Sequence, residues 1–229
     1  MRIVGLDIGG ANLKLADADG RGRSRAFAMW KDFSRLECVL SEQLDAFGDA
    51  DLVAVTMTAE LADCFATKAE GIDFILNAVE RAADRRPVFV WQTGGEFVTP
   101  DEAQELPELV AAANWHALAT WAGRIAPAGK ALLADLGSTT ADFIPIENGM
   151  PVPVGRTDLE RLQSGELVYS GVRRTPLCAV ASSVEFRGAS CPLAAELFAT
   201  TLDVYLLLGE RADEPANTDT ANGKPATIS

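Results

Sequence analysis

The sequence predicts an α/β protein built from two related halves, and three observations lead to this fold class. Apolar strand patterns alternate with longer helical patterns between residues 34 and 125, as in mixed sheets flanked by helices. An N-terminal order of strand, glycine turn and strand returns near residue 131. The chain has 229 residues, 48% of them hydrophobic, which is enough for one large domain or two small ones with buried cores.

The first half opens with a predicted meander of three strands and continues with alternating helices and strands. The meander covers residues 3–8, 13–18 and 24–30, and its first strand ends at Gly9-Gly10. The elements expected after it are a helix at 34–47, a strand at 52–56, a helix at 71–83, a strand at 88–91 and a helix at 111–125.

The second half repeats the opening pattern. Strands are expected at 131–136 and 142–146, followed by a hairpin turn at Asn148-Gly149. Asp7 and Asp135, at the ends of the two first strands, are 128 positions apart, which indicates an internal duplication.

Three further segments complete the second half. Residues 151–192 are predicted to form a loop-rich insertion, residues 193–208 a helix that ends at Gly209, and residues 210–229 a mobile polar tail. We therefore expect a first lobe at 1–128, a second and incomplete lobe at 129–209, and the tail at 210–229.

Charge and composition exclude several classes of partner. The net charge is −13 and no run of Lys and Arg occurs, which argues against nucleic acid and against an anionic membrane surface. No segment approaches the ~18 apolar residues of a membrane span, and no signal peptide is recognised, so we expect a cytoplasmic protein. A single histidine and four cysteines without close spacing make a zinc site implausible and predict reduced thiols.

The two strand-turn-strand segments carry the residues that predict phosphate chemistry. The first reads Asp7-x-Gly9-Gly10-x-Asn12-x-Lys14, and the second reads Asp135-x-Gly137-Ser138-Thr139-Thr140-x-Asp142. Glycines let backbone N–H groups approach an anion, hydroxyls and a lysine add donors, and strand-end carboxylates can hold Mg²⁺. One such turn alone is usually structural, but its repetition in the same context favours two phosphate-binding loops, with Asp7 and Asp135 as metal ligands.

A second group of candidates lies in the Arg-rich stretch 155–176. Arg173, Arg174 and Thr175 follow the second loop and could neutralise phosphates, while a structural lattice of salt bridges is an equal alternative. His116, in the segment 114–116, is expected to pack rather than to act as a general base. Glu60 and Asp63 could bind a substrate amine or a metal, or could be a charge pair at a helix N-terminus.

The two loops resemble the phosphate-1 and phosphate-2 loops of the actin-like ATPase superfamily, which includes sugar kinases and hydantoinase/oxoprolinase proteins. This resemblance implies duplicated ribonuclease-H-like domains. Within the superfamily, the sequence is similar to tetrahydromethanopterin-linked one-carbon-transfer proteins and to the archaeal transferases of methanofuran biosynthesis. The stretches that carry this similarity are residues 57–63, 113–117, 155–176 and 203–209.

The resemblance implies a transferase that condenses an aminomethylfuran diphosphate with γ-glutamyltyramine and releases pyrophosphate. In this hypothesis Lys14 and the arginines stabilise the leaving diphosphate with Mg²⁺, and Asp142 accepts a proton. The alternatives are an ATP-dependent small-molecule kinase or ATPase and a non-catalytic regulator that binds a phosphate ligand. Only 89 residues follow Thr140 and they contain no Gly-Gly pair, so we expect either a truncated form of the family or a diphosphate ligand that needs no adenosine pocket. The expected partners are a diphosphate and an amine or phenol. The chain could also form a homodimer.

Overall fold

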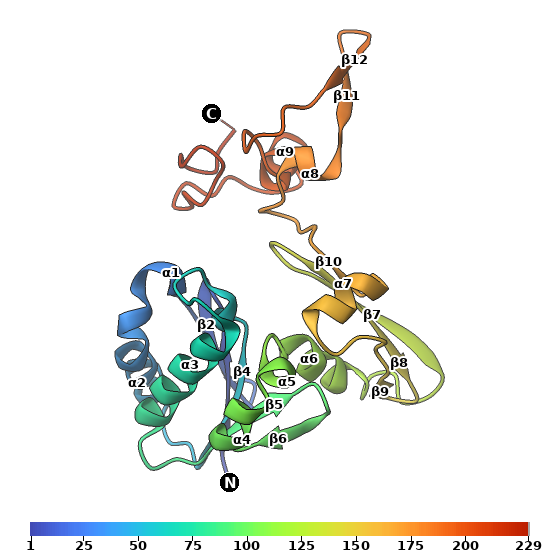
Figure 1. Ribbon diagram of the computed structural model, residues 1–229. Coiled ribbons are helices and arrows are strands. Elements are labelled where there is room, and N and C mark those ends of the chain that lie inside the picture. Colours follow the sequence, from blue (N-terminus) through green and yellow to red (C-terminus); the bar gives the residue numbers. More distant parts are fainter. Residues whose placement is uncertain (229) are drawn as a thin grey trace. The chain divides into compact units, whose positions relative to one another are not determined.

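The computed structural model describes residues 1–228, which form two compact units (Figure 1). The first unit contains residues 1–131 and 145–161, and the second contains residues 132–144 and the chain from 162 onward. Both units contain strands and helices, so the predicted α/β class with mixed sheets and flanking helices is confirmed.

The first unit is built on a six-stranded mixed sheet in the order β3-β2-β1-β4-β5-β6. Its central strand β1 pairs antiparallel with β2 and parallel with β4, and β4 pairs parallel with β5. The strands are β1 (Ile3–Ile8), β2 (Asn12–Asp17), β3 (Gly22–Ala26), β4 (Leu52–Met57), β5 (Val88–Gln92) and β6 (Glu96–Val98). Five of these strands lie close to the predicted ones, except that the third ends at Ala26 because the chain turns into a short helix at Met29, and β6 was not predicted.

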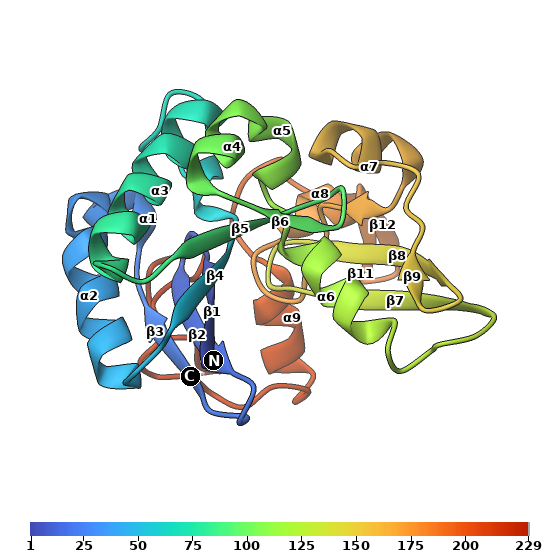
Figure 2. The same cartoon turned by 90° about the horizontal axis from the view of Figure 1, so that it is seen from below.

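Helices α2 (Leu36–Phe47) and α3 (Lys68–Ala83) pack together on one face of this sheet (Figure 2). Strand side chains alternate between the two faces, so every second residue of β1 points into this layer. Val4, Leu6 and Ile8 are each at most 2% exposed there. The same core takes in Val53, Val55 and Met57 of β4, so one apolar layer fixes the register of both strands.

Short helices follow β6, and the last of them lies over the opposite face of the sheet. They are α4 (Pro100–Glu105), α5 (Pro107–Val110) and α6 (Asn114–Ala122). A capping box between Thr99 and Glu102 starts α4, with Pro100 in its first turn. Helix α6 contacts β4 and β5, and it is shorter than predicted because the chain turns at Ala112, where φ is 48°.

The second sheet has the order β10-β8-β7, with β9 paired to β8. Its strands are β7 (Lys130–Leu136), β8 (Ala141–Glu147), β9 (Met150–Pro151) and β10 (Leu167–Val168). The predicted turn at Asn148-Gly149 is present, with φ of 51° and 81°, the positive values of the favoured hairpin type. Strands β7 and β8 contribute residues to both compact units.

The rest of the second unit contains more regular structure than the predicted insertion. Helix α7 (Asp158–Ser164) contributes residues to both units, and the later elements are α8 (Leu177–Val180), the hairpin β11 (Ser183–Phe186) and β12 (Ala189–Pro192), and α9 (Thr201–Leu207). The predicted helix over 193–208 is wrong in its first half. A capping box between Thr200 and Asp203 starts α9, while Leu193 and Ala199 use their backbone to bond Ser182 and Leu177.

The C-terminal segment packs against α9 in the described part of the second unit. Ala226 is buried with Leu202 and Leu206 of α9, and its backbone pairs with Glu214 and Asn217. The predicted lobe boundaries and tail mobility stay predictions. No helix within residues 1–228 has the length and apolarity needed to cross a membrane.

Candidate functional site

The first predicted loop is a tight turn between β1 and β2. The Gly9 N–H donates to the carbonyl oxygen of Asn12 at 3.0 Å, and a Cβ at Gly9 would lie only 2.9 Å from that oxygen. The position therefore needs glycine. Gly10 has no atom within 4 Å of its would-be Cβ, so the tip of the loop is open.

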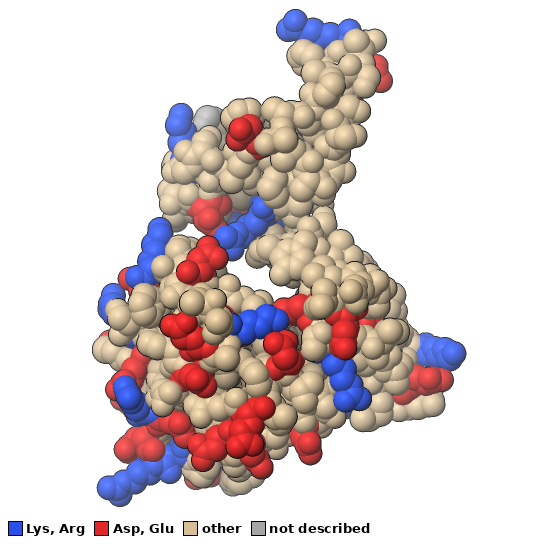
Figure 3. Space-filling view, viewed as in Figure 1, with Lys and Arg blue, Asp and Glu red and all other residues tan. Residues whose placement is uncertain are grey.

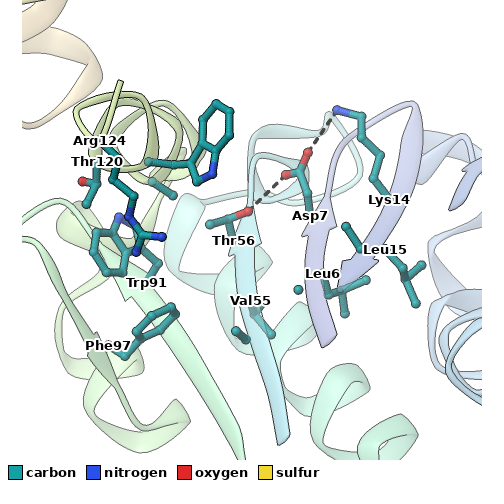
Figure 4. Close-up of a pocket in the computed structure, with 15 residues that line it drawn as sticks. Leu6, Asp7, Lys14, Leu15, Val55, Thr56, Trp91, Phe97, Thr120 and Arg124 are labelled. Atoms are coloured by element: carbon teal, nitrogen blue, oxygen red, sulfur yellow. Dashed lines mark hydrogen bonds and ion pairs between the residues drawn. The ribbon is translucent and has the colours of Figure 1, made fainter. Parts of the chain in front are cut away.

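Asp7 and Lys14 lie side by side at the base of this loop (Figure 4). Lys14 Nζ lies 3.0 Å from Asp7 Oδ2, and the Thr56 hydroxyl donates to Asp7 Oδ1 at 3.3 Å. The three residues are cross-strand neighbours on β2, β1 and β4 and point away from the α2 and α3 layer. Sequence analysis missed Thr56, although a polar residue near the end of the next parallel strand is the signal that could have found it.

The second predicted loop repeats the turn of the first. Gly137 N–H donates to the carbonyl oxygen of Thr140 at 2.8 Å, and a Cβ at Gly137 would lie 3.2 Å from it. Ser138 and Thr139 stand at the tip with their hydroxyl oxygens 3.5 Å apart. Asp135 is next to last in β7, as Asp7 is in β1, so the duplication inferred from the sequence holds at the level of the backbone.

The Arg-rich segment packs directly on this second loop. The Arg173 and Arg174 N–H groups donate to the Ser138 carbonyl oxygen at 3.1 and 2.9 Å. Gly171 approaches so closely that a Cβ would lie 2.5 Å from the Ser138 backbone. The Thr175 hydroxyl accepts from the Gly171 N–H at 2.7 Å and closes the segment on itself. The structure thus brings together the residues predicted for the second loop and those predicted for the Arg-rich stretch.

The two arginine side chains are paired with carboxylates of the C-terminal segment. Arg173 forms an ion pair with Glu214, and Arg174 Nε lies 3.8 Å from Asp219 Oδ2. Glu214 also accepts from Arg211 at 3.1 Å and from Asn217 at 3.2 Å. The hydrogen bond from Arg173, with these contacts, lowers the pKa of Glu214 to about 2. Their contacts are therefore those of the alternative interpretation, a structural lattice of salt bridges. Phosphate binding by Arg173 and Arg174 stays a prediction.

Glu60 and Asp63 do not form a helix N-terminal pair. Helix α3 begins only at Lys68, where the Thr67 hydroxyl accepts from the Glu70 N–H at 3.1 Å. Glu60 is 1% exposed and its Oε1 accepts from the Ala112 N–H at 2.7 Å, whereas Asp63 lies at the surface. Burial raises the pKa of Glu60 to about 7 despite the hydrogen bond.

His116 of α6 packs, as predicted, in an aromatic cluster with Trp115 of the same helix and Trp91 of β5. Trp91 Nε1 donates to His116 Nδ1 at 3.3 Å, and the Trp115 ring lies at 5.3 Å, edge-on. Burial lowers the pKa of His116 to about 4, and Arg156 and Arg161 act in the same direction. The imidazole is therefore neutral at physiological pH.

A pocket of about 390 Å³ lies on the sheet face that carries Asp7 (Figure 4). Small side chains of β1, β2 and β4 form its floor, and the aromatic residues Trp91, Phe97 and Trp121 form its wall. No sequence pattern predicted this pocket, because the small residues come together only through cross-strand pairing.

Surface charge follows the composition. On the face shown in Figure 3, Asp and Glu gather over the first unit, and Lys and Arg lie between them singly or in small groups. Across residues 1–228, no group of three or more His, Cys, Asp or Glu side chains lies close enough to hold a metal ion by itself.

A family model described as hydantoinase/oxoprolinase matches residues 51–225. A (4-{4-[2-(gamma-L-glutamylamino)ethyl]phenoxymethyl}furan-2-yl)methanamine synthase of Methanocaldococcus jannaschii is 41% identical over 224 residues, covering 96% of this chain and 66% of the relative. A protein of the same name from Methanococcus vannielii is 41% identical over 95 residues, 42% of each chain. The chain therefore spans 66% of the length of the first of these curated relatives.

Among solved structures, a nucleotide-free acetone carboxylase aligns with 94% of this chain and 56% of its own, with 11% identity and a TM-score of 0.50. A Ppx/GppA family protein of Aquifex aeolicus covers 67% of this chain and 49% of its own, with 18% identity and a TM-score of 0.37. The likeness to acetone carboxylase is one of fold.

Proposed function

Because the chain belongs to the hydantoinase/oxoprolinase family, we propose that it acts as a transferase that makes an aryl ether of furanmethanamine. In this reaction an aminomethylfuran diphosphate and γ-glutamyltyramine condense, and pyrophosphate leaves. The observation that carries the proposal is the 41% identity over 96% of the chain to a synthase whose name states a phenoxymethyl-furan product.

The bond changes of this reaction define what the protein must supply. The phenolic oxygen of the acceptor bonds to the methylene carbon of the furan, and the bond between that carbon and the diphosphate oxygen breaks. The phenolic proton goes to a base, and the electron pair of the broken bond leaves with pyrophosphate. The furan ring stabilises positive charge on the methylene, so the main task is to stabilise the leaving diphosphate.

The first loop offers groups for that task. The open tip at Gly10 leaves room for an anion beside the loop backbone, and Lys14 adds a positive charge beside Asp7. Mg²⁺ commonly uses one or two carboxylates plus phosphate oxygens and waters, so Asp7 with the neighbouring Thr56 hydroxyl fits it. Bound there, Mg²⁺ would supply positive charge to the diphosphate oxygens.

The second loop offers a comparable set of donors. Its side-chain donors are the hydroxyls of Ser138, Thr139 and Thr140, with Asp135 at the end of the preceding strand. Arg173 and Arg174 attach to the loop by their backbone and could turn from their carboxylate partners to a phosphate. We assign Asp142, half-buried in β8, as the acceptor of the phenolic proton.

The test is pyrophosphate release by the protein with Mg²⁺, an aminomethylfuran diphosphate and γ-glutamyltyramine. We expect release that depends on the acceptor and falls about 100-fold or more in Asp7→Asn and in Asp135→Asn, because each change removes a carboxylate proposed to hold the Mg²⁺ that stabilises the leaving diphosphate. Asp45→Asn, at an exposed position of α2, is the matched control and should leave the rate unchanged. Release from ATP without acceptor, or no release at all, would contradict the proposal.

A further inference from the structure

The pocket on the first sheet has a floor made of three small residues that are neighbours across the strands. Gly5 of β1 pairs with Ala16 of β2 on one side and with Ala54 of β4 on the other. A Cβ at Gly5 would be only in ordinary contact, 3.6 Å from the Ala16 carbonyl oxygen. The absence of large side chains at three adjacent positions leaves a flat apolar surface at which a planar ring can lie.

One side of this floor is bounded by aromatic rings. Trp91 and Phe97 contact edge to face with centroids 4.9 Å apart, and Trp121 of α6 also lines the pocket. Phe97 is 51% exposed and Trp121 is 58% exposed, so much aromatic surface faces open space. Exposed aromatic surface at a concave site is typical of a place where a ligand binds.

Charged groups stand on two sides of the same pocket (Figure 4). Arg124 lies beside Thr120 and Trp91, and among residues 1–228 its guanidinium has no ion pair. Asp7, with its Lys14 partner, lies on the other side and belongs to the first loop. An apolar floor between a lone arginine and a polar corner matches a ligand that is aromatic in its middle and anionic at one end.

We propose that this pocket binds the acceptor substrate, with its aromatic ring on the floor of small residues and its carboxylate on Arg124. The inference rests on the proposed function, whose acceptor carries a phenol ring and a glutamyl carboxylate. The pocket size agrees, because sites for small molecules commonly enclose roughly 300–1,000 Å³. Trp91, Phe97 and Trp121 then act as the surfaces that recognise the ring, and Arg124 recognises the acid.

The experiment measures binding of γ-glutamyltyramine alone, without the diphosphate donor, by tryptophan fluorescence and by calorimetry. Two of the four tryptophans, Trp91 and Trp121, line the pocket, so binding is expected to change the emission. Ala54→Leu places a larger side chain in the open pocket and is expected to weaken binding at least 10-fold. The matched control Ala46→Leu, at an exposed position of α2, should bind like the unchanged protein.

A second variant tests the carboxylate contact. Arg124→Gln is expected to weaken binding of γ-glutamyltyramine about 10-fold but to leave binding of tyramine, which lacks the carboxylate, unchanged. Unaltered binding of γ-glutamyltyramine in both Ala54→Leu and Arg124→Gln, with native circular dichroism, would overturn the proposal. The proposal would also be overturned if γ-glutamyltyramine does not bind and Ala54→Leu abolishes self-association of the protein, because a second copy of the chain would then occupy the pocket.

Binding and turnover separate this inference from the proposed function. Pocket-dependent binding without pyrophosphate release would support the site and overturn the transferase reaction. Release of pyrophosphate with an unchanged KM for the acceptor in Ala54→Leu would support the transferase reaction and overturn the pocket as the acceptor site.

Discussion

The two loops share one backbone turn but obtain their positive charge in different ways. Each turn is closed by an N–H to carbonyl hydrogen bond across three residues, at Gly9 and at Gly137. The first loop carries its own cation, Lys14, on the adjacent strand. The position that corresponds to Lys14 in the repeat is Asp142, and the cationic residues whose backbone bonds the second loop are Arg173 and Arg174. A duplicated turn thus keeps its local geometry while its electrostatics depend on distant residues.

The strands behind the two loops also differ in how well they are covered. Leu6 on β1 is 2% exposed in a core shared with α2 and α3, whereas Leu132 and Leu136 on β7 are 65% and 61% exposed. One buried apolar cluster of the second unit consists of Leu202, Leu206 and Ala226, and Ala141, Ile144 and Leu167 are buried elsewhere in that unit. The turn therefore forms with or without a large core behind it, because its hydrogen bond is local.

The sharpest way to test this difference in packing is to truncate one leucine in each strand. Leu6→Ala should lower the free energy of unfolding by about 3 kcal/mol, because a fully buried leucine leaves a cavity. Leu136→Ala should change it by no more than about 0.5 kcal/mol, since that side chain is mostly exposed. Urea denaturation followed by circular dichroism measures both, and equal losses would show that β7 is covered in solution.

Buried Glu60 gives the first unit a pH dependence of its own. Its pKa is raised from the usual carboxylate range to about 7, so the folded chain holds a proton that the unfolded chain has already released. The free energy of unfolding therefore falls as pH rises from about 4.5 through 7. Glu60→Gln should remove this slope, which amounts to about 3 kcal/mol at most, because the amide stays neutral. All four tryptophans lie in the first unit, so their fluorescence in urea at pH 5 and pH 8 reports it.

His116 acts in the opposite sense over a similar range, since its pKa is lowered to about 4 and protonation of the unfolded chain favours unfolding below pH 6.5. This contribution is the same in the Glu60→Gln variant and cancels in the difference between the two proteins. Parallel slopes for the two would refute the assignment to Glu60.

Glycine substitutions distinguish the packed loop segment from the open loop tip. Gly171→Ala should destabilise the protein by about 2 kcal/mol, because its Cβ would collide with the Ser138 backbone and push the arginines off the second loop. In Gly10→Ala the new Cβ has no atom within 4 Å, so the free energy of unfolding should stay within about 0.5 kcal/mol of that of the unchanged protein. Thermal unfolding of the pair measures the contrast, which disappears if the segment does not pack on the loop.

Acid should weaken the C-terminal contacts of the second unit, with a smaller effect than the changes above. The pKa of Glu214 is lowered to about 2, so its contribution is complete above about pH 4.5 and is lost as the pH falls toward 2. Both tyrosines, Tyr169 and Tyr205, lie in the second unit, and their ring NMR signals should broaden or shift over this range. In Glu214→Gln the signals should be altered at every pH, and an unchanged acid transition there would exclude Glu214 as its cause.

Local elements of the fold were predictable because their causes lie within a few residues. Strands β1, β2, β4 and β5, helices α2 and α3 and the Asn148-Gly149 turn follow from side-chain periodicity and turn residues. The start of α9 was missed because one capping box outweighed an apolar pattern that continued upstream of Thr200. The hairpin of β11 and β12 was missed because its short strands lie in a stretch rich in polar and small residues.

The residues of the candidate site also divide into those that the local sequence predicts and those that depend on pairing between distant strands. Asp7, Gly9 and Lys14 were found because strand-turn-strand geometry fixes their neighbourhood within eight residues of sequence. Thr56 and the pocket floor depend on pairing between strands that are far apart along the chain. Pairing registers of this kind are set by the buried core and not by the residues that face the pocket.

By itself, the sequence determined the two turns, because glycine is required where a carbonyl oxygen lies within about 3 Å of the would-be Cβ. It also determined the acidic charge and the α/β class. Only the tertiary structure decided that Glu60 is buried, since Ala112 meets it from 52 positions away, and that Arg173 pairs with Glu214. Local hydrogen bonds need only neighbouring residues, whereas burial and charge pairing depend on which distant segments the folded core brings together.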